Sequence, residues 1–92
     1  MCVKLKIVIT PTQIRAARAL ASLTQVELAQ GASVGIATVR RIEGSTVLSA
    51  NVQTIQKLQE ALEDRGILFI EEDHTNGPGV RLRDRTTKMR FE

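Results

Sequence analysis

The sequence contains very few aromatic residues. Its 92 residues include two Phe and no Trp or Tyr, so aromatic residues make up only 2% of the chain. Proteins that bind RNA or single-stranded nucleic acid stack the bases on aromatic side chains, and this chain has too few rings for such a platform. Its core must therefore be built from aliphatic side chains.

Cysteine and histidine are almost absent as well. Cys2 is the only cysteine and His74 the only histidine, which excludes an intrachain disulfide and a cysteine-based zinc site. No stretch approaches the roughly 20 apolar residues of a membrane span, and the start of the chain lacks a signal-peptide pattern. No nucleophile, second histidine or phosphate loop accompanies the carboxylates. We expect a cytoplasmic protein that is not an enzyme, with no metal or other cofactor and no membrane partner.

Charge is distributed unevenly along the chain. Lys and Arg number 13 and Asp and Glu 10, which gives a formal net charge of +3 at pH 7. Carboxylates gather within residues 60–73, whereas only Glu27 and Glu43 lie in the first half. That half also carries four arginines: Arg15, Arg18, Arg40 and Arg41. We therefore expect a basic face on the N-terminal half, which is compatible with binding to a polyanion.

Two capping-box patterns predict the first helices. The segment 10–13, Thr-Pro-Thr-Gln, predicts a helix that runs to about Ser22, and the segment 24–27, Thr-Gln-Val-Glu, predicts a second, short helix. Two glycines bracket a break at residues 31–35, after which helical spacing returns over 36–43 and stops at Gly44. A fourth helix, capped by Ser49 or Asn51, should run to Gly66 with Val52 on its inner face.

Strand patterns flank this helical region. Residues 3–7 alternate apolar and basic side chains, and residues 7–9 are apolar, so residues 1–9 are predicted to form an N-terminal edge strand or arm. Residues 67–83 predict a β-hairpin with strands at 67–71 and 80–83, and residues 84–92 have the composition of a flexible tail. The expected fold is mainly α with a small β element. It comprises a helical domain over residues 10–66 and a C-terminal hairpin.

Residues 25–44 have the pattern of a helix-turn-helix. Ala29 supplies the small side chain that two steeply crossing helices need where their backbones approach. The wider pattern resembles the XRE family, the Cro or phage-repressor type, over about residues 14–62. The resemblance rests on Ile14-Arg15-x-Ala17-Arg18, Leu23-Thr24-Gln25-x-Glu27-Leu28-Ala29, Val34, Thr38-Val39 and Arg41-Ile42-Glu43. It implies a four- to five-helix phage-repressor-like domain that binds double-stranded DNA and regulates transcription, for example as a repressor.

The resemblance also implies roles for individual residues. Helix 36–43 would be the recognition helix, Gln25 would contact a phosphate, and Arg18 would pair with Glu43. The implied DNA-binding residues are Arg15, Thr24, Gln25, Gly35, Ile36, Ala37, Thr38, Arg40 and Arg41. Because Ile36 and Ala37 cannot donate hydrogen bonds, we expect them to touch thymine methyl groups, while Arg41 or Arg40 reads guanine. The sequence departs from the family at Ser33, where glycine is usual, and at Gly35, where a serine or threonine cap is usual.

One recognition helix covers only a few base pairs, so we expect a homodimer. The apolar hairpin is the first candidate for the interface, and the N-terminal strand and the fourth helix are alternatives. The candidate dimerisation residues of the hairpin are Ile67, Leu68, Phe69, Ile70, Val80 and Leu82. Two other functions remain open: an antitoxin that binds a toxin and autoregulates its operon, and an adaptor or antiactivator that binds another protein, such as an activator.

Overall fold

The computed structural model of the protein describes residues 9–45 and 52–83. These residues form four helices, α1 (Pro11–Leu20), α2 (Gln25–Ala32), α3 (Ile36–Glu43) and α4 (Val52–Glu63), followed by the strands β1 (Ile67–Ile70) and β2 (Gly79–Leu82). The strands pair in antiparallel order, so the predicted fold class, mainly α with a C-terminal hairpin, is confirmed. The predicted N-terminal strand, except Ile9, and the caps Ser49 and Asn51 lie outside the described residues, as does the tail over 84–92.

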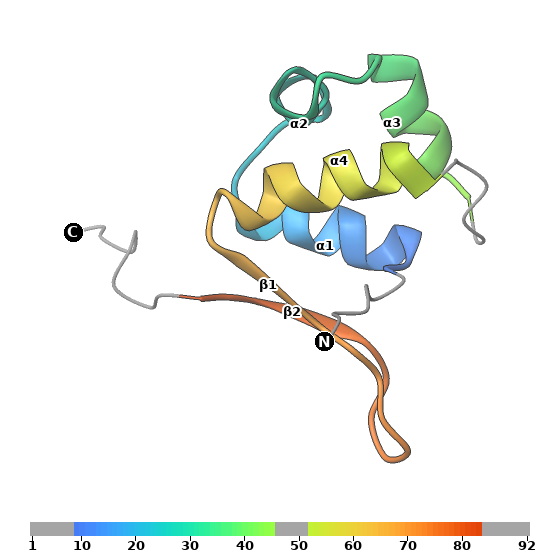
Figure 1. Ribbon diagram of the computed structural model, residues 1–92, viewed down its shortest axis with the longest axis vertical. Coiled ribbons are helices and arrows are strands. Elements are labelled where there is room, and N and C mark those ends of the chain that lie inside the picture. Colours follow the sequence, from blue (N-terminus) through green and yellow to red (C-terminus); the bar gives the residue numbers. More distant parts are fainter. Residues whose placement is uncertain (1–8, 46–51, 84–92) are drawn as a thin grey trace.

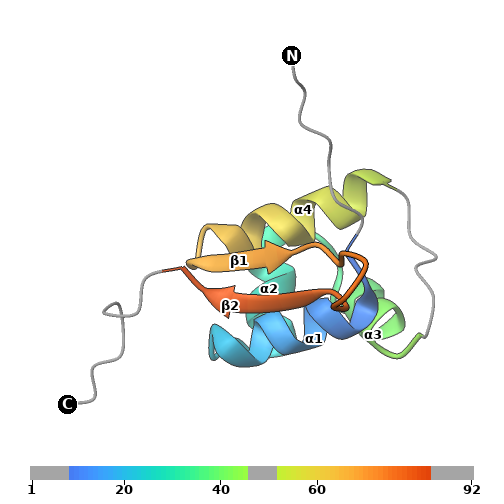
Figure 2. The same cartoon turned by 90° about the horizontal axis from the view of Figure 1, so that it is seen from below.

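The elements are arranged in three layers (Figure 1). Helices α1 and α4 lie side by side in the middle, α2 and α3 cover one side of this pair, and the hairpin covers the other. Seen from the hairpin side, β1 runs over α4 and β2 runs over α1 (Figure 2). The hairpin and the α2–α3 pair are thus on opposite sides of the same two helices. None of the described helices has the length and apolar character needed to span a bilayer.

The ends of α1 and α2 follow directly from the sequence. Both helices begin with a complete capping box, in which the Thr10 and Thr24 hydroxyls each accept a bond of 3.0 Å from a backbone N–H three residues on. A serine with left-handed backbone follows each helix, Ser22 after α1 and Ser33 after α2, and both have φ of 59°. The following residue donates back to the helix, as in a Schellman motif. These stops make α1 end at Leu20, two residues before the predicted end.

The core is aliphatic, as the composition requires. Among the described residues, Phe69 is the only aromatic side chain in it. The largest fully buried side chains come from every layer: Ile9, Ile14, Leu28, Val39, Ile42, Leu58, Leu62 and Ile67. The predicted inner position of Val52 is wrong, since this side chain is 70% exposed. Val52 is the first residue of α4, and among the described residues no other element covers it.

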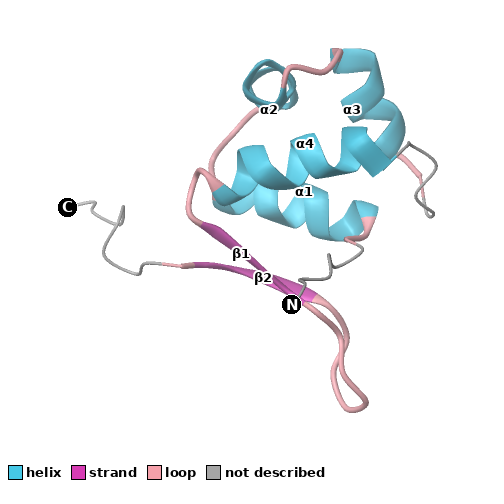
Figure 3. Ribbon diagram, viewed as in Figure 1, coloured by secondary structure: helices cyan, strands magenta, loops and turns pink. Residues whose placement is uncertain are grey.

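The hairpin presents different faces to the helices and to solvent. Along β1, Ile67 and Phe69 are buried against the helices, and Leu68 and Ile70 point outward. The pairing continues one residue beyond the strands, because the Arg83 backbone N–H donates to the Gly66 carbonyl at 2.7 Å. The loop over residues 71–78 projects beyond the helices (Figure 3).

Asp73 organises this exposed hairpin loop. Its carboxylate accepts hydrogen bonds from the backbone N–H groups of Thr75 and Asn76, at 2.9 and 2.7 Å, and from the Thr75 hydroxyl. These bonds to the ionised form, first that from the Thr75 N–H, hold the pKa of Asp73 below its usual range. The acidic loop is therefore ordered by local bonds of the kind found in Asx turns.

Candidate nucleic-acid interface

The turn between α2 and α3 is short and tightly bonded. The Val34 N–H donates to the Ala29 carbonyl at 3.0 Å, and the Ser33 N–H donates to the Gln30 carbonyl at 3.2 Å. Ala29 is 4% exposed, which fits its expected place where the two helices approach. Ser33 adopts the left-handed conformation that glycine usually supplies. The substitution of serine for glycine therefore leaves a regular α2–turn–α3 geometry in place.

Helix α3 has one buried and one exposed face. Val39 and Ile42 are buried in the core, whereas Ala37, Arg40 and Arg41 are exposed. The exposed side chains follow helical spacing of three and four residues, so they share one face. Gly35, which caps the helix without a side-chain bond, is exposed just before this face.

Two of the expected groove-facing residues are less accessible. Ile36 and Thr38 are half-buried, and Ile36 packs against the core. Ile36 lies three residues before the fully buried Val39, which places part of its side chain toward the core. Contact of Ile36 with a thymine methyl group stays a prediction.

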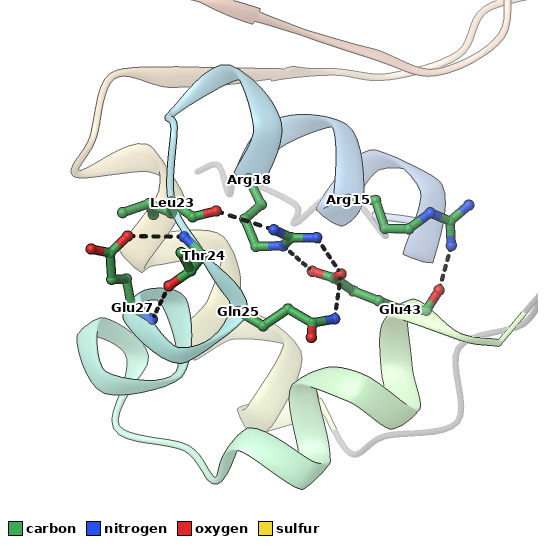
Figure 4. Close-up of polar contacts among 7 residues, drawn as sticks. All are labelled: Arg15, Arg18, Leu23, Thr24, Gln25, Glu27 and Glu43. Atoms are coloured by element: carbon green, nitrogen blue, oxygen red, sulfur yellow. Dashed lines mark hydrogen bonds and ion pairs between the residues drawn. The ribbon is translucent and has the colours of Figure 1, made fainter.

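Glu43 joins three helices at the far end of α3 (Figure 4). Arg18 of α1 binds its carboxylate with two bonds, from Nε at 2.8 Å and from Nη2 at 2.9 Å. Arg18 also donates to the Leu23 carbonyl at 3.1 Å, and the Gln25 Nε2 donates to Glu43 at 3.1 Å. The hydrogen bond to Glu43 raises the pKa of Arg18. Glu43 is 4% exposed and the Arg18 side chain is 23% exposed, so this pair, which the family resemblance implies, joins α1, α2 and α3 through a buried carboxylate and a partly buried guanidinium.

Arg15 and Gln25 both belong to this junction. The Arg15 Nη1 donates to the backbone carbonyl of Glu43, and its Nη2 donates to the Thr12 hydroxyl at 3.2 Å. Gln25 is half-buried and gives one N–H to Glu43. The resemblance assigned both residues to DNA, and neither bond to Glu43 was visible in the sequence because their partner lies 18 or more residues away.

The charges around α3 are mostly positive. Arg18–Glu43 is the one ion pair among the described residues, so Glu43 contributes no free negative charge to this side. Within residues 9–45 the remaining charged side chains are Arg15, Arg40, Arg41 and Glu27. Thr24 is exposed at the N-terminus of α2, and its hydroxyl already accepts the capping bond from the Glu27 N–H. The exposed end of α2 and the outer face of α3 together form a surface with a net positive charge.

The candidate dimerisation residues occupy three environments. Ile67 and Phe69 are 1% and 7% exposed, so their side chains belong to the core of the protomer. Val80 and Leu82 are half-buried and pack against that core. Only Leu68 and Ile70, which are 45% and 39% exposed, offer apolar side chains to a partner.

One further polar residue, Gln13, has contacts that the sequence did not predict. It was expected only as the third residue of a capping box, yet its side chain is buried and also bonds the hairpin.

No cluster of three or more His, Cys, Asp or Glu side chains within residues 9–45 and 52–83 is placed to hold a metal ion. No family model matches the chain, and no curated protein matches it.

Proposed function

We propose that this protein is a sequence-specific transcriptional regulator that binds double-stranded DNA by laying α3 in the major groove. The observation that carries the proposal is the exposed face of Ala37, Arg40 and Arg41 on a short helix whose opposite face is buried. The tight α2–α3 turn and the buried Glu43 junction hold this helix rigidly on the surface. A rigid, outward helix with two arginines suits the readout of base edges.

The side chains on this face define the chemistry of the readout. An arginine can donate two bonds to the O6 and N7 atoms of guanine, and a small apolar side chain can contact the methyl group of thymine. Arg40 and Arg41 are exposed for the first role and Ala37 for the second. We therefore propose half-sites that contain guanine and thymine at the positions that these residues meet.

The N-terminus of α2 is suited to a phosphate. The first N–H groups of a helix have no partner within the helix, and its dipole favours an anion there. The amide nitrogen of Gln25 carries two hydrogens and gives one to Glu43, so the second can reach a phosphate oxygen. Glu43 thereby orients the amide for this contact.

We further propose that the protein acts as a homodimer joined at the outward face of the hairpin. Leu68 and Ile70 supply the apolar contact. The hairpin and the α2–α3 pair lie on opposite sides of α1 and α4 (Figure 1), so a partner bound at the hairpin would leave the exposed face of α3 uncovered. A dimer doubles the number of base pairs that are read, since each copy contacts one half-site.

A random-library selection for bound duplex DNA tests these proposals in one experiment. The wild-type chain should enrich two copies of one half-site at a fixed spacing, and its affinity should fall steeply with salt, by roughly one unit of log–log slope per phosphate neutralised. Arg41→Ala should lower the affinity for the selected site by about 1–3 kcal/mol and relax the preference at one base pair.

Matched variants separate the parts of the proposal. Arg65→Ala removes the same charge from an exposed position between α4 and β1 and should leave the base preference unchanged. Replacing Leu68 and Ile70 with threonine should leave a single half-site in the selected sequences. A selection that enriches nothing above the input library at low salt, or a base preference untouched by Arg41→Ala, would contradict major-groove reading by α3.

A further inference from the structure

The hairpin loop contains the pair Asn76-Gly77, which the proposed function does not use. Every residue of this loop, over 71–78, is exposed, and the loop projects from the side of the molecule opposite α2 and α3 (Figure 3). The chain has one other asparagine, Asn51, and the branched residue Val52 follows it. The peptide nitrogen after an asparagine can attack the side-chain amide most readily when the next residue is glycine, since glycine has no Cβ. Asn76 is therefore the asparagine at which we looked for such a reaction.

The structure leaves the peptide nitrogen of Gly77 open. Within residues 9–45 and 52–83, no group accepts a hydrogen bond from the Gly77 N–H. A Cβ added at Gly77 would meet no atom within 4 Å, so no packing shields this nitrogen. The Asn76 carbonyl of the same peptide accepts a bond of 2.8 Å from the Asp73 N–H. This bond favours loss of the nitrogen's proton, because the negative charge of a deprotonated peptide lies largely on its oxygen.

The side-chain amide of Asn76 is held only loosely. In the described part of the chain its Nδ2 donates one bond, to the Thr75 hydroxyl, and this bond is long at 3.3 Å. Both side chains are exposed, so water competes for this bond. The main chain of Asn76 is better fixed, since its N–H donates to the Asp73 carboxylate at 2.7 Å. The amide carbon Cγ can therefore reach the next peptide nitrogen by rotation of the side chain.

We propose that Asn76 is a site of spontaneous deamidation, in which the chain modifies itself with water as the only co-reactant. The deprotonated Gly77 nitrogen attacks Asn76 Cγ, the new C–N bond closes a succinimide ring, and the Cγ–Nδ2 bond breaks. The leaving nitrogen takes up the equivalent of the proton that Gly77 lost and departs as ammonia. Water then opens the ring at either of its carbonyl carbons, which yields aspartate or isoaspartate. Nothing is oxidised or reduced, and the loop gains one negative charge. This inference does not depend on the proposed function.

Isoaspartate would change the loop and leave the strands in place. Its main chain passes through Cβ and is one carbon longer, and the former Asn76 carbonyl becomes a free carboxylate. The two backbone bonds between Asn76 and Asp73 lie within the altered segment. The base of the loop is held separately, because the buried Gln13 amide donates to the Ile70 and Gly79 carbonyls at 3.3 and 3.0 Å. The reaction should therefore alter the charge and shape of the loop without unfolding the helices or the hairpin.

The test incubates the full-length chain at mildly alkaline pH and maps the products by electron-transfer fragmentation, which distinguishes isoaspartate from aspartate. We expect both products at Asn76 and none at Asn51, where the branched side chain of the next residue hinders the attack. Gly77→Ala places a methyl group beside the attacking nitrogen and should slow the reaction about tenfold or more. Gly79→Ala is the matched control in the same hairpin and should leave the rate unchanged. An added Cβ has room at both glycines.

A parallel incubation in urea shows whether the folded loop permits the reaction. If Asn76 reacted in urea but stayed intact in the folded chain, the proposal would be overturned, because the loop would then protect it. A Gly77→Ala variant that reacts as fast as the wild type would also overturn it, since the attack would not come from this nitrogen. The same holds if aspartate formed without isoaspartate, as direct hydrolysis of the amide predicts. The incubated wild type should keep its circular dichroism spectrum, while the amide NMR signal of Thr75 shifts.

Discussion

The buried junction at Glu43 makes a strong prediction for Arg18→Met. Methionine fills much of the space of the arginine stem but cannot donate a hydrogen bond. The Glu43 carboxylate, with its side chain 3% exposed, would lose both bonds from Arg18 and keep only the bond from Gln25. The substitution therefore leaves a buried and nearly unpaired charge.

The magnitude follows from the cost of such a charge. Removing one partner of a buried ion pair typically costs about 3–5 kcal/mol, a large part of the roughly 5–15 kcal/mol that stabilises a small domain. In a domain of this length each kcal/mol lowers the melting temperature by about 4–8 °C. We thus expect Arg18→Met to melt at least about 12 °C below the wild type.

The double variant Arg18→Met/Glu43→Leu provides the decisive comparison. Replacing both members of a buried pair with apolar side chains is often close to neutral, because no unpaired charge remains. The double variant should therefore be more stable than Arg18→Met alone, as measured by urea denaturation. Arg15→Met is the control, since this exposed residue bonds only the Glu43 carbonyl and the Thr12 hydroxyl and should cost about 0.5–1.5 kcal/mol. A double variant as unstable as the sum of its single variants would refute the argument that burial of Glu43 dominates.

Two further predictions concern the turn and the hairpin loop. Ser33→Gly should raise the free energy of unfolding by up to about 1 kcal/mol, because glycine adopts the positive φ of 59° without strain; Ser33→Ala, which keeps Cβ, should bring no gain in a denaturant titration. The lowered pKa of Asp73 means that its bonds to Thr75 and Asn76 contribute fully above the usual aspartate range and are lost as the pH falls through the lowered value. The amide NMR signals of Thr75 and Asn76 should report this transition in the wild type. If the same transition appeared in a titration of Asp73→Asn, it would arise from another titrating group.

The sequence predicted best where the determinants are local. The capping boxes of α1 and α2, the break before α3 and the hairpin depend on residues within a few positions of one another, and each lies within two residues of its predicted place. The end of α1 shifted by two residues because Ser22 can stop a helix in the left-handed conformation that glycine usually takes. The sequence carries no local pattern that marks this choice.

The contacts that the sequence could not predict join distant segments. Gln13 bonds residues 57 and 66 positions away, and Gln25 bonds Glu43 across the helix crossing. The apolar run at residues 67–70 predicted an interface. Side chains alternate between the two faces along β1, however, so Ile67 and Phe69 are buried in the core. Which face of a strand is covered depends on what packs against it, and here that is α1 and α4, far away in the sequence.

In the proposed DNA-binding role, the small exposed face of α3 favours two copies. Of its described side chains only Ala37, Arg40 and Arg41 are exposed there, and Ala37 offers no hydrogen bond. A good bidentate contact discriminates against the wrong base by about 1–3 kcal/mol, so two arginines provide about 2–6 kcal/mol for one copy. Specific recognition generally requires about 4–10 kcal/mol over non-specific binding. One copy would therefore reach at most the lower part of that range, whereas two copies, at about 4–12 kcal/mol, would span it without any further base contact.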